Sequence, residues 1–280
     1  MKKSKVILMS DIHYRCANYF GRSPEEIAEL LCEDLAAEYE KEPYDALLLL
    51  GDYSLDHWGW RTKGTYITKG ISNAKIFAER YLERIVPDGV GVRMIAGNHE
   101  QYGEELWHEL TGHWRRDHIV IGDILFILTD TFGADLDPTE HSDGTYSGAN
   151  VADIKALMSN YPDKKVILCA HWFDMNRESQ EFCELLRKEE RVLCLFCGHN
   201  HQSCIQNTGE NTGNKPILCT GHYSYSGEPN NIRCLPGYRV LEFDGVGLLS
   251  KYVVHPHTYQ LDEVKFSNEY TEQDILELKF

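Results

Sequence analysis

Five apolar runs in the sequence each end directly in aspartate, asparagine or histidine. In the first, residues 5–10 lead into Asp11 and His13. The pattern returns four times, in ALLLLGD (46–52), VRMIAGNHE (92–100), VILCAH (166–171) and LCLFCGHNH (193–201). Continuous apolar runs of this length are typical of strands buried on both faces of a parallel sheet. The carboxyl ends of such strands share one sheet edge, where ligands bind. We therefore expect the polar residues after the five runs to meet in one cleft.

Helical spacing of apolar residues separates several of these runs. Ser23 and Pro24 mark the start of a helix that reaches residue 41. Further helices are expected at 74–85, 150–161 and 177–189, and further strands at 118–122, 124–130, 216–220, 238–243 and 247–254. Strands that alternate with helices up to residue 200 favour a largely parallel sheet, and the strand-rich remainder favours a second sheet beside it. The sequence predicts one domain over residues 1–280, with a motif-bearing part at 5–201 and a β-rich part at 203–280.

Composition excludes several partners. The formal net charge is −16, which argues against extended contact with a nucleic-acid backbone. No apolar run approaches the roughly 18 residues of a membrane span, so no membrane partner is expected. Nine cysteines are an odd number, and only four apolar residues stand between the basic start and Ser10. We expect no secretory leader and a reducing compartment, the cytoplasm.

The residues at the five strand ends are donors that metal ions use. They comprise two carboxylates, one amide and five imidazoles: Asp11, Asp52, Asn98, His13, His99, His171, His199 and His201. Carboxylate and neutral imidazole bind Zn, Mn, Fe or Ni. Each short motif alone is common in ordinary turns, but five in succession favour a metal site. There are too many donors for one tetrahedral ion, so the set predicts two ions that share a carboxylate.

The order D-x-H, G-D, G-N-H-E, H and G-H-x-H resembles the signature of the calcineurin-like metallophosphoesterases over residues 5–201. The resemblance implies an α/β fold, a four-layer α/β/β/α sandwich of two mixed β-sheets flanked by helices. It also implies two divalent metal ions, of Mn, Fe, Zn or Ni. In the family pattern one ion is held by Asp11, His13 and His201, and the other by Asn98, His171 and His199. Asp52 bridges the two ions.

The same resemblance implies hydrolysis of a phosphate ester by a hydroxide that bridges the ions, with Asp52 and His99 as catalytic residues. His99 is the general acid for the leaving group. The expected substrate is a small or medium phosphorylated compound, and monoester, diester and pyrophosphate hydrolysis stay open. Many members have Asp where this chain has Glu100. The segment GDYSLDHWGW lacks the Arg of the protein Ser/Thr phosphatase branch. Its Asp56 either orients His99 or is an ordinary loop residue.

Substrate contacts are expected from the loops 53–70 and 131–148. The candidates are Trp58, Trp60 and Arg61, and His222 at the rim, although the tryptophans equally suit a cover for their own loop. Two readings of other classes compete with the enzyme. One is a protein-binding scaffold of the same fold that is weakly active or inactive. The other is a zinc module on Cys194 and Cys197, for which core packing is the favoured alternative. The oligomeric state stays open.

Overall fold

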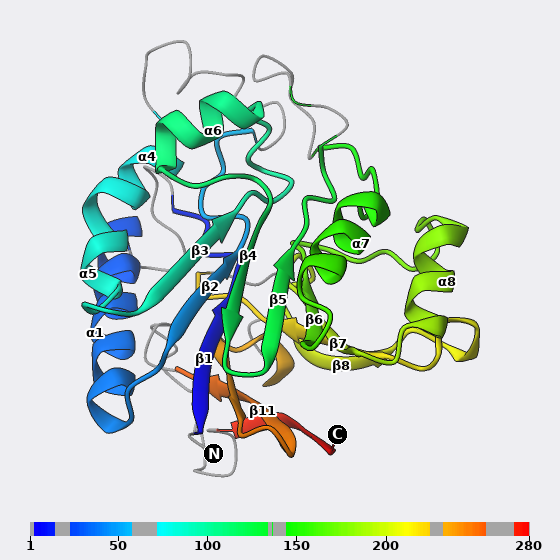
Figure 1. Cartoon of the computed structure of the whole chain (residues 1–280). Helices are drawn as coiled ribbons and strands as arrows, with labels where there is room; N and C mark the ends of the chain where they lie inside the picture. The colour runs from blue at the N-terminus through cyan, green and yellow to red at the C-terminus, as the bar shows by residue number, and fades with distance from the viewer. Residues whose placement is uncertain are drawn as a thin grey trace.

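The structure is a computed structural model of the 280-residue chain. It describes residues 3–14, 23–57, 72–133, 136, 144–224, 232–255 and 272–279. The described strands form two six-stranded mixed sheets flanked by helices (Figure 1). This arrangement confirms the predicted α/β sandwich. No helix among the described residues combines the length and the apolarity needed to cross a membrane.

The first sheet joins the two ends of the chain. Its strand order is β12-β11-β10-β1-β2-β3. The strands are β1 (Ser4–Met9), β2 (Ala46–Leu50), β3 (Gly91–Ile95), β10 (Gly237–Phe243), β11 (Gly247–Val254) and β12 (Glu272–Lys279). β1, β2 and β3 are parallel, whereas β10 pairs antiparallel with β1 in the register Ser4↔Phe243. The carboxyl ends of β1, β2 and β3 therefore lie side by side.

The second sheet contains the middle of the chain in the order β4-β5-β6-β7-β9-β8. Its strands are β4 (Asp117–Ile121), β5 (Ile124–Leu128), β6 (Lys165–Cys169), β7 (Val192–Cys197), β8 (Ser203–Asn207) and β9 (Pro216–Thr220). β5, β6, β7 and β9 are parallel, and β4 and β8 are antiparallel edge strands. The expected division, one sheet up to residue 200 and another after it, is wrong. Apolar runs buried on both faces do not encode which strand lies beside which.

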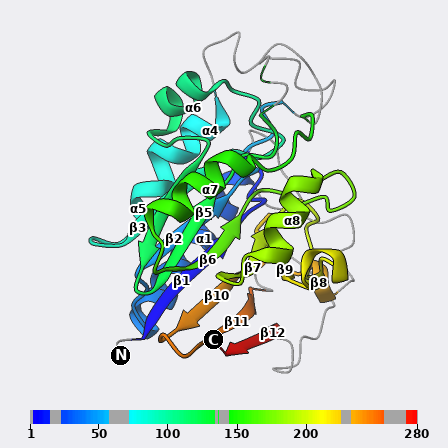
Figure 2. The same ribbon diagram turned by 45° about the vertical axis from the view of Figure 1, so that its right-hand side comes forward.

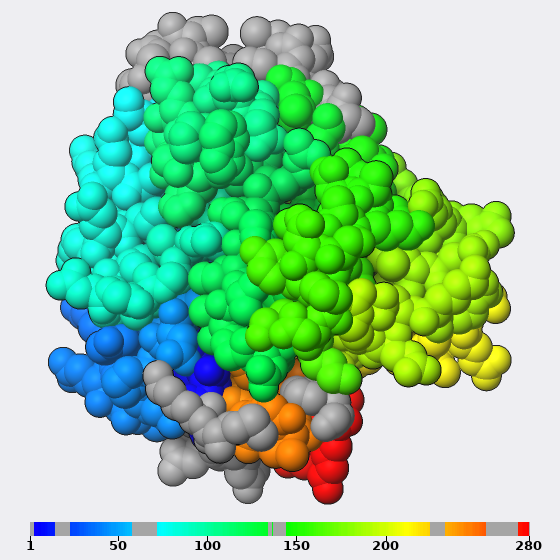
Figure 3. All heavy atoms as spheres, viewed as in Figure 1, coloured from blue at the N-terminus to red at the C-terminus, as the bar shows by residue number. Residues whose placement is uncertain are grey.

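Helices cover the outer face of each sheet. The helical segments beside the first sheet are α1 (Pro24–Lys41), α4 (Asn73–Phe77), the π-helical turn η1 (Ala78–Leu82) and α5 (Glu83–Ile85). α7 (Val151–Asn160) and α8 (Gln180–Lys188) cover the second sheet. Figure 2 shows α7 and α8 on the opposite side of the strands from α1, and in Figure 3 they form the right-hand part of the surface. The predicted helix at 24–41 is confirmed, with Ser23 as its N-cap.

Alternate residues of the central strands face different layers. Ile7 and Met9 of β1 pack with the helices of the first sheet. Val6 and Leu8 pack between the sheets, against residues such as Phe126. This strict alternation buries both faces, as expected for parallel strands inside a sandwich. Three elements were not predicted: α6 (Glu104–Thr111), β8 and β12. The short 3₁₀ turns are η2 (Glu210–Thr212) and η3 (Ile232–Cys234).

The C-x-x-C pair of β7 belongs to the core. Cys194 packs between the two sheets, whereas Cys197 packs toward α7 and α8. Both thiols are buried. Since the two side chains leave the strand on opposite faces, they do not converge on one ion, and core packing is the correct reading.

Candidate metal centre

The structure brings the predicted polar residues together from both sheets. Asp11, His13, Asp52, Asn98 and His99 follow strands β1, β2 and β3 of the first sheet. His171, His199 and His201 follow strands β6 and β7 of the second sheet. The expectation of a single sheet edge is therefore wrong in one respect, because two sheet edges meet. The backbone amide of His199 donates to the carboxylate of Asp11 at 2.9 Å and links the two.

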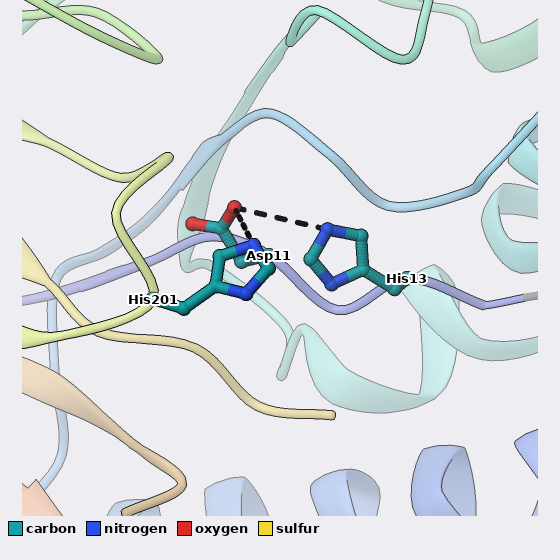
Figure 4. Close-up of side chains that lie close together, drawn as sticks. All are labelled: Asp11, His13 and His201. Carbon is teal, nitrogen blue, oxygen red and sulfur yellow. Dashed lines mark ion pairs between the residues drawn. The ribbon is translucent and has the colours of Figure 1, made fainter. Parts of the chain in front are cut away.

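One half of the centre consists of Asp11, His13 and His201, whose donor atoms lie within 4.8 Å of one another. Figure 4 shows both imidazoles turned toward the carboxylate of Asp11. Its Oδ1 atom lies 3.3 Å from Nε2 of His201 and 3.9 Å from Nε2 of His13. Ser224 donates to the carbonyl of Asp11, so its hydroxyl oxygen accepts from Nδ1 of His13 at 3.0 Å. That bond directs Nε2 of His13 into the centre.

The other half consists of Asn98, His171 and His199. Oδ1 of Asn98 lies 2.9 Å from Nε2 of His171 and 2.9 Å from Nδ1 of His199. Nδ1–H of His171 donates to the carbonyl of Leu50 at 2.8 Å. This hydrogen bond fixes the tautomer that presents the Nε2 lone pair to the centre, a device common among metal-binding histidines.

Asp52 lies between the halves. Its Oδ2 atom is 3.1 Å from Nε2 of His171 and 3.7 Å from Nε2 of His13. Nε2 of His99 also lies 3.7 Å from that oxygen. Three groups in the described residues therefore have metal-ligand spacing, and the second contains His99: Asp11–His13–His201, His13–Asp52–His99 and Asp52–His171–His199. The donors present fit two divalent cations that share Asp52.

The backbone at these residues is strained. Seven non-glycine residues in the described part of the chain have positive φ angles, and five are candidate ligands: Asp11 (55°), His13 (50°), Asp52 (57°), His199 (69°) and His201 (53°). This left-handed region disfavours residues that carry a Cβ atom. Such strain clusters at functional sites. The chain thus turns sharply after β1, β2 and β7, where these five donors enter the centre.

A buried carboxylate supports the turns that carry Asp52 and Asn98. Oε2 of Glu100 accepts from the backbone amides of Asp52 and Gly97, both at 2.8 Å. Its Oε1 atom accepts from the amide of Ser54 at 3.0 Å. Gly97 has no space for a side chain, because a Cβ atom would collide with the carboxylate of Asp52. Glu100 therefore holds the two ligand loops against each other through their backbone amides.

Charge and burial oppose each other in the centre. Burial alone would raise the pKa of Asp11, but the His201 and His171 imidazoles keep it below its ordinary value. Burial lowers the pKa of His13 to about 4 and, with the charge of His171, that of His199 to about 4. Burial also acts to lower the pKa of His171, yet Asp52 raises it to about 9. His13 and His199 are therefore neutral near pH 7 beside carboxylates, a combination suited to a cation.

A model of the calcineurin-like phosphoesterase family matches residues 4–203, which is more than half of the chain. The chain belongs to this family. The match spans every candidate ligand, and the family typically uses two divalent ions, in agreement with the donor groups of the structure.

Solved structures of the superfamily share the fold of this calcineurin-like phosphoesterase. A dimetal phosphatase from Danio rerio is similar, with a TM-score of 0.61 and 12% identity over 99% of this chain and 98% of that chain. Purple acid phosphatase PPD1 from yellow lupin has a TM-score of 0.54 and 16% identity over 90% and 52%. GAP50, the anchor in the inner membrane complex of Plasmodium, has a TM-score of 0.55 and 13% identity over 98% and 88%. No curated protein matches the chain.

Asp56 has neither of the roles expected for it. It is fully buried, and its carboxylate caps the start of α4 rather than orienting His99. It accepts from the hydroxyl of Ser72 at 3.0 Å and from the amides of Asn73 and Ala74 at 3.0 and 3.3 Å. The hydroxyl of Tyr102 donates to the same oxygen as Ser72. The capped helix starts 17 residues after Asp56, so no local sequence signal reveals the contact.

A second unpredicted residue, Arg115, ties the loop after β3 to the second sheet. Its guanidinium forms a two-point ion pair with Asp130, through Nε at 2.8 Å and Nη2 at 3.2 Å. Nη1 donates to the carbonyls of Glu100 and Tyr102 at 2.5 and 3.0 Å. Arg115 is fully buried. In the sequence Arg115 stands in the tripeptide WRR (114–116), which is typical of exposed charged residues. Its buried role could not be seen there because its acceptors lie elsewhere in the sequence.

The predicted substrate contacts are mostly not described. Trp58, Trp60 and Arg61 lie outside the described residues. His222 is fully buried, with its ring 5.9 Å from that of His201. Its Nε2–H donates to the carbonyl of Cys234 at 2.8 Å. His222 therefore lies behind the first half of the centre, and its contact with substrate stays a prediction.

Proposed function

We propose that this calcineurin-like phosphoesterase hydrolyses a small or medium phosphate ester with two divalent ions. The observation that carries the proposal is the arrangement of two donor groups around one shared carboxylate, Asp52. The positive φ angles at five of the donors support it, since strain of this kind is retained where function requires it. The net charge of −16 makes an extended nucleic acid an unsuitable substrate.

The residues of the chain have distinct tasks in this proposal. Asp11, His13 and His201 hold one ion, Asn98, His171 and His199 hold the other, and Asp52 contacts both. Two divalent ions, when bound, activate a water molecule and neutralise charge on the phosphoryl oxygens. His99 lies at the edge of the cluster with Nε2 3.7 Å from Asp52, and it protonates the leaving oxygen. General acid catalysis of this type contributes about 10²–10⁴-fold.

The test compares esters with different leaving groups. We would load the full chain with Mn²⁺, Ni²⁺ or Zn²⁺ and measure hydrolysis of p-nitrophenyl phosphate, bis-p-nitrophenyl phosphate and an alkyl phosphate. Asp52→Asn should abolish metal-dependent turnover. His99→Ala should slow the alkyl ester by about 10²–10⁴-fold and the p-nitrophenyl esters less, because p-nitrophenolate leaves without prior protonation. His118→Ala, whose ring contacts Tyr161 on another part of the chain, is the matched control.

The outcomes separate the enzyme from a scaffold of the same fold. If metal-dependent turnover persists in Asp52→Asn, Asp52 is not the carboxylate that the two ions share. Equal losses for alkyl and p-nitrophenyl esters in His99→Ala would contradict its role as general acid. Absence of turnover for every ester, with or without bound ions, would favour a protein that binds a partner through this fold. The preferred substrate of the wild type distinguishes a monoesterase from a diesterase.

A further inference from the structure

Three aromatic rings form a cluster beside the imidazoles of the second half of the centre, and two of them contact those imidazoles. The rings of Phe132, Tyr146 and Trp172 are in contact with one another, at centroid distances of 5.2 to 6.3 Å. Trp172 stacks on His199 at 4.4 Å with an interplanar angle of 27°. Phe132 lies 5.8 Å from the ring of His171 and 5.9 Å from that of His199. The second half therefore has an aromatic wall, to which Trp172 contributes the closest contact.

The orientation of His199 has a different origin from that of the other imidazoles. His13 and His171 each have a hydrogen bond from the ring nitrogen remote from the centre, to Ser224 and Leu50 respectively. Within the described part of the chain, Nε2 of His199 has no such hydrogen-bond partner, and the ring contacts Asn98 through Nδ1 alone. Among the rings around it, the indole of Trp172 makes the closest contact with this imidazole and is the main restraint on its rotation.

Trp172 is itself held in place. The hydroxyl of Thr131 donates to its backbone carbonyl at 3.0 Å. The neighbouring Tyr146 accepts from the amide of Asp174 at 3.0 Å and donates to the carboxylate of Glu178. Glu178 in turn accepts from the amide of Ala149 at 3.2 Å. These contacts hold the backbone of Trp172 and the ring of Tyr146, against which the indole packs.

We propose that Trp172 is a positioning residue for the second ion, and this inference rests on the proposed function. The stack holds the His199 imidazole with Nδ1 toward Asn98. Coordination makes an imidazole electron-poor, and the indole face attracts electron-poor groups. The partners that orient a ligand typically contribute 10–100-fold to metal affinity. The affinity for one of the two ions therefore depends on Trp172.

The experiment is a Mn²⁺ titration of the metal-free full chain, with free Mn²⁺ measured by electron paramagnetic resonance. Trp172→Ala should weaken one ion by about 10–100-fold, and Trp172→Phe, which retains a ring, should weaken it less. Trp114→Ala is the matched control, because Trp114 stacks on His108 at 4.0 Å and is 40% exposed. It should bind both ions as the wild type does. Thermal unfolding of each metal-free variant reports on folding separately.

Two further variants, each lacking a ligand of one half of the centre, show which ion depends on Trp172. In His201→Ala, the remaining ion should weaken when Trp172→Ala is added. In His171→Ala, adding Trp172→Ala should leave the affinity for the remaining ion unchanged. Unchanged affinities in Trp172→Ala, or weakening only in the His171→Ala background, would overturn the inference. Normal ion binding with a raised KM would do so too, and would make Trp172 a substrate contact. A wild type that binds fewer than two ions would refute the proposed function itself, and the inference with it.

Discussion

The buried ion pair between Arg115 and Asp130 gives the sharpest test of how the centre is supported. Arg115→Met removes both bonds to Asp130 and the two bonds from Nη1 to the carbonyls of Glu100 and Tyr102. Leaving one partner of a buried pair alone costs about 3–5 kcal/mol. The two carbonyls left without a donor add to this cost. We expect the free energy of unfolding to fall by at least about 4 kcal/mol.

This loss is measurable as a shift of the melting temperature. An unfolding entropy of about 2.1 cal/mol/K per residue gives about 0.6 kcal/mol/K for a chain of this length. A loss of about 4 kcal/mol then lowers Tm by about 7 °C. The neighbouring Arg116 is the control, since its ion pair with Asp153 is about half exposed. Exposed pairs contribute about 0–1 kcal/mol, so Arg116→Met should shift Tm by less than about 2 °C.

A double-mutant cycle tests the cause of the loss. Asp130→Asn alone leaves the Arg115 charge buried, while keeping an oxygen for the amide of Phe132, which donates to Asp130 at 2.9 Å. The double variant contains no buried charge at this position. It should therefore lose less than the sum of the single variants, by about 2–3 kcal/mol. Additivity within about 0.5 kcal/mol would refute the argument that an uncompensated buried charge is the main cost.

Three further results are expected. Glu100→Gln places an amide NH₂ against backbone N–H donors that now bond to a carboxylate oxygen. The free energy of unfolding, measured with denaturant, should fall by about 2–4 kcal/mol, and unchanged stability would contradict the role of Glu100 as an acceptor for these amides. Gly144→Ala combines a φ angle of 71° with a Cβ atom 2.9 Å from the carbonyl of Asn98, so it should lower the affinity for the second ion. Gly89→Ala is the control: its φ angle is 83° but there is open space around it, so it should introduce backbone strain without changing ion affinity. In the metal-free protein Asp52 keeps the pKa of His171 at about 9 against the effect of burial, so below that pH the second ion must displace a proton. Its apparent affinity should rise about tenfold per pH unit between pH 6 and 8, and a pH-independent affinity in Mn²⁺ titrations would exclude His171 as a ligand.

Sequence reasoning located the candidate ligands because their signal is local. Asp11 and Asp52 each follow an apolar run within two residues, and parallel strand ends lie at one edge by geometry. Which strands belong to which sheet could not be predicted from local sequence patterns. β1 pairs with β10, more than 200 residues away, and both faces of β1 are buried. A strand that is buried on both faces carries no local mark of its neighbour, so the sequence did not show that two sheet edges meet at the centre.

The residues that support the ligands were missed for a related reason. Glu100, Asp56 and Arg115 are charged, and charged residues are mostly exposed. Each is buried because it satisfies backbone groups that lie far away in sequence, as when Arg115 binds the carbonyl of Glu100. Trp172 stands next to His171 in the sequence, yet its partner is His199, on the adjacent strand end. The residue types were visible, but the pairings were not.

The left-handed backbone at five ligands explains why this support is extensive. At about 1–2 kcal/mol per residue, five such conformations cost about 5–10 kcal/mol, which is comparable to the whole stability of an ordinary domain. The cost falls on loops that begin directly after buried strands, so the sheets fix one end of each loop and cannot relax it. Glu100 and Trp172 contact the strained residues Asp52 and His199 directly, by a hydrogen bond and by stacking, and Arg115 holds the loop after β3. Bound ions stabilise the same conformations by mass action. Loss of one of these supporting residues should therefore weaken metal binding in addition to lowering the stability of the fold.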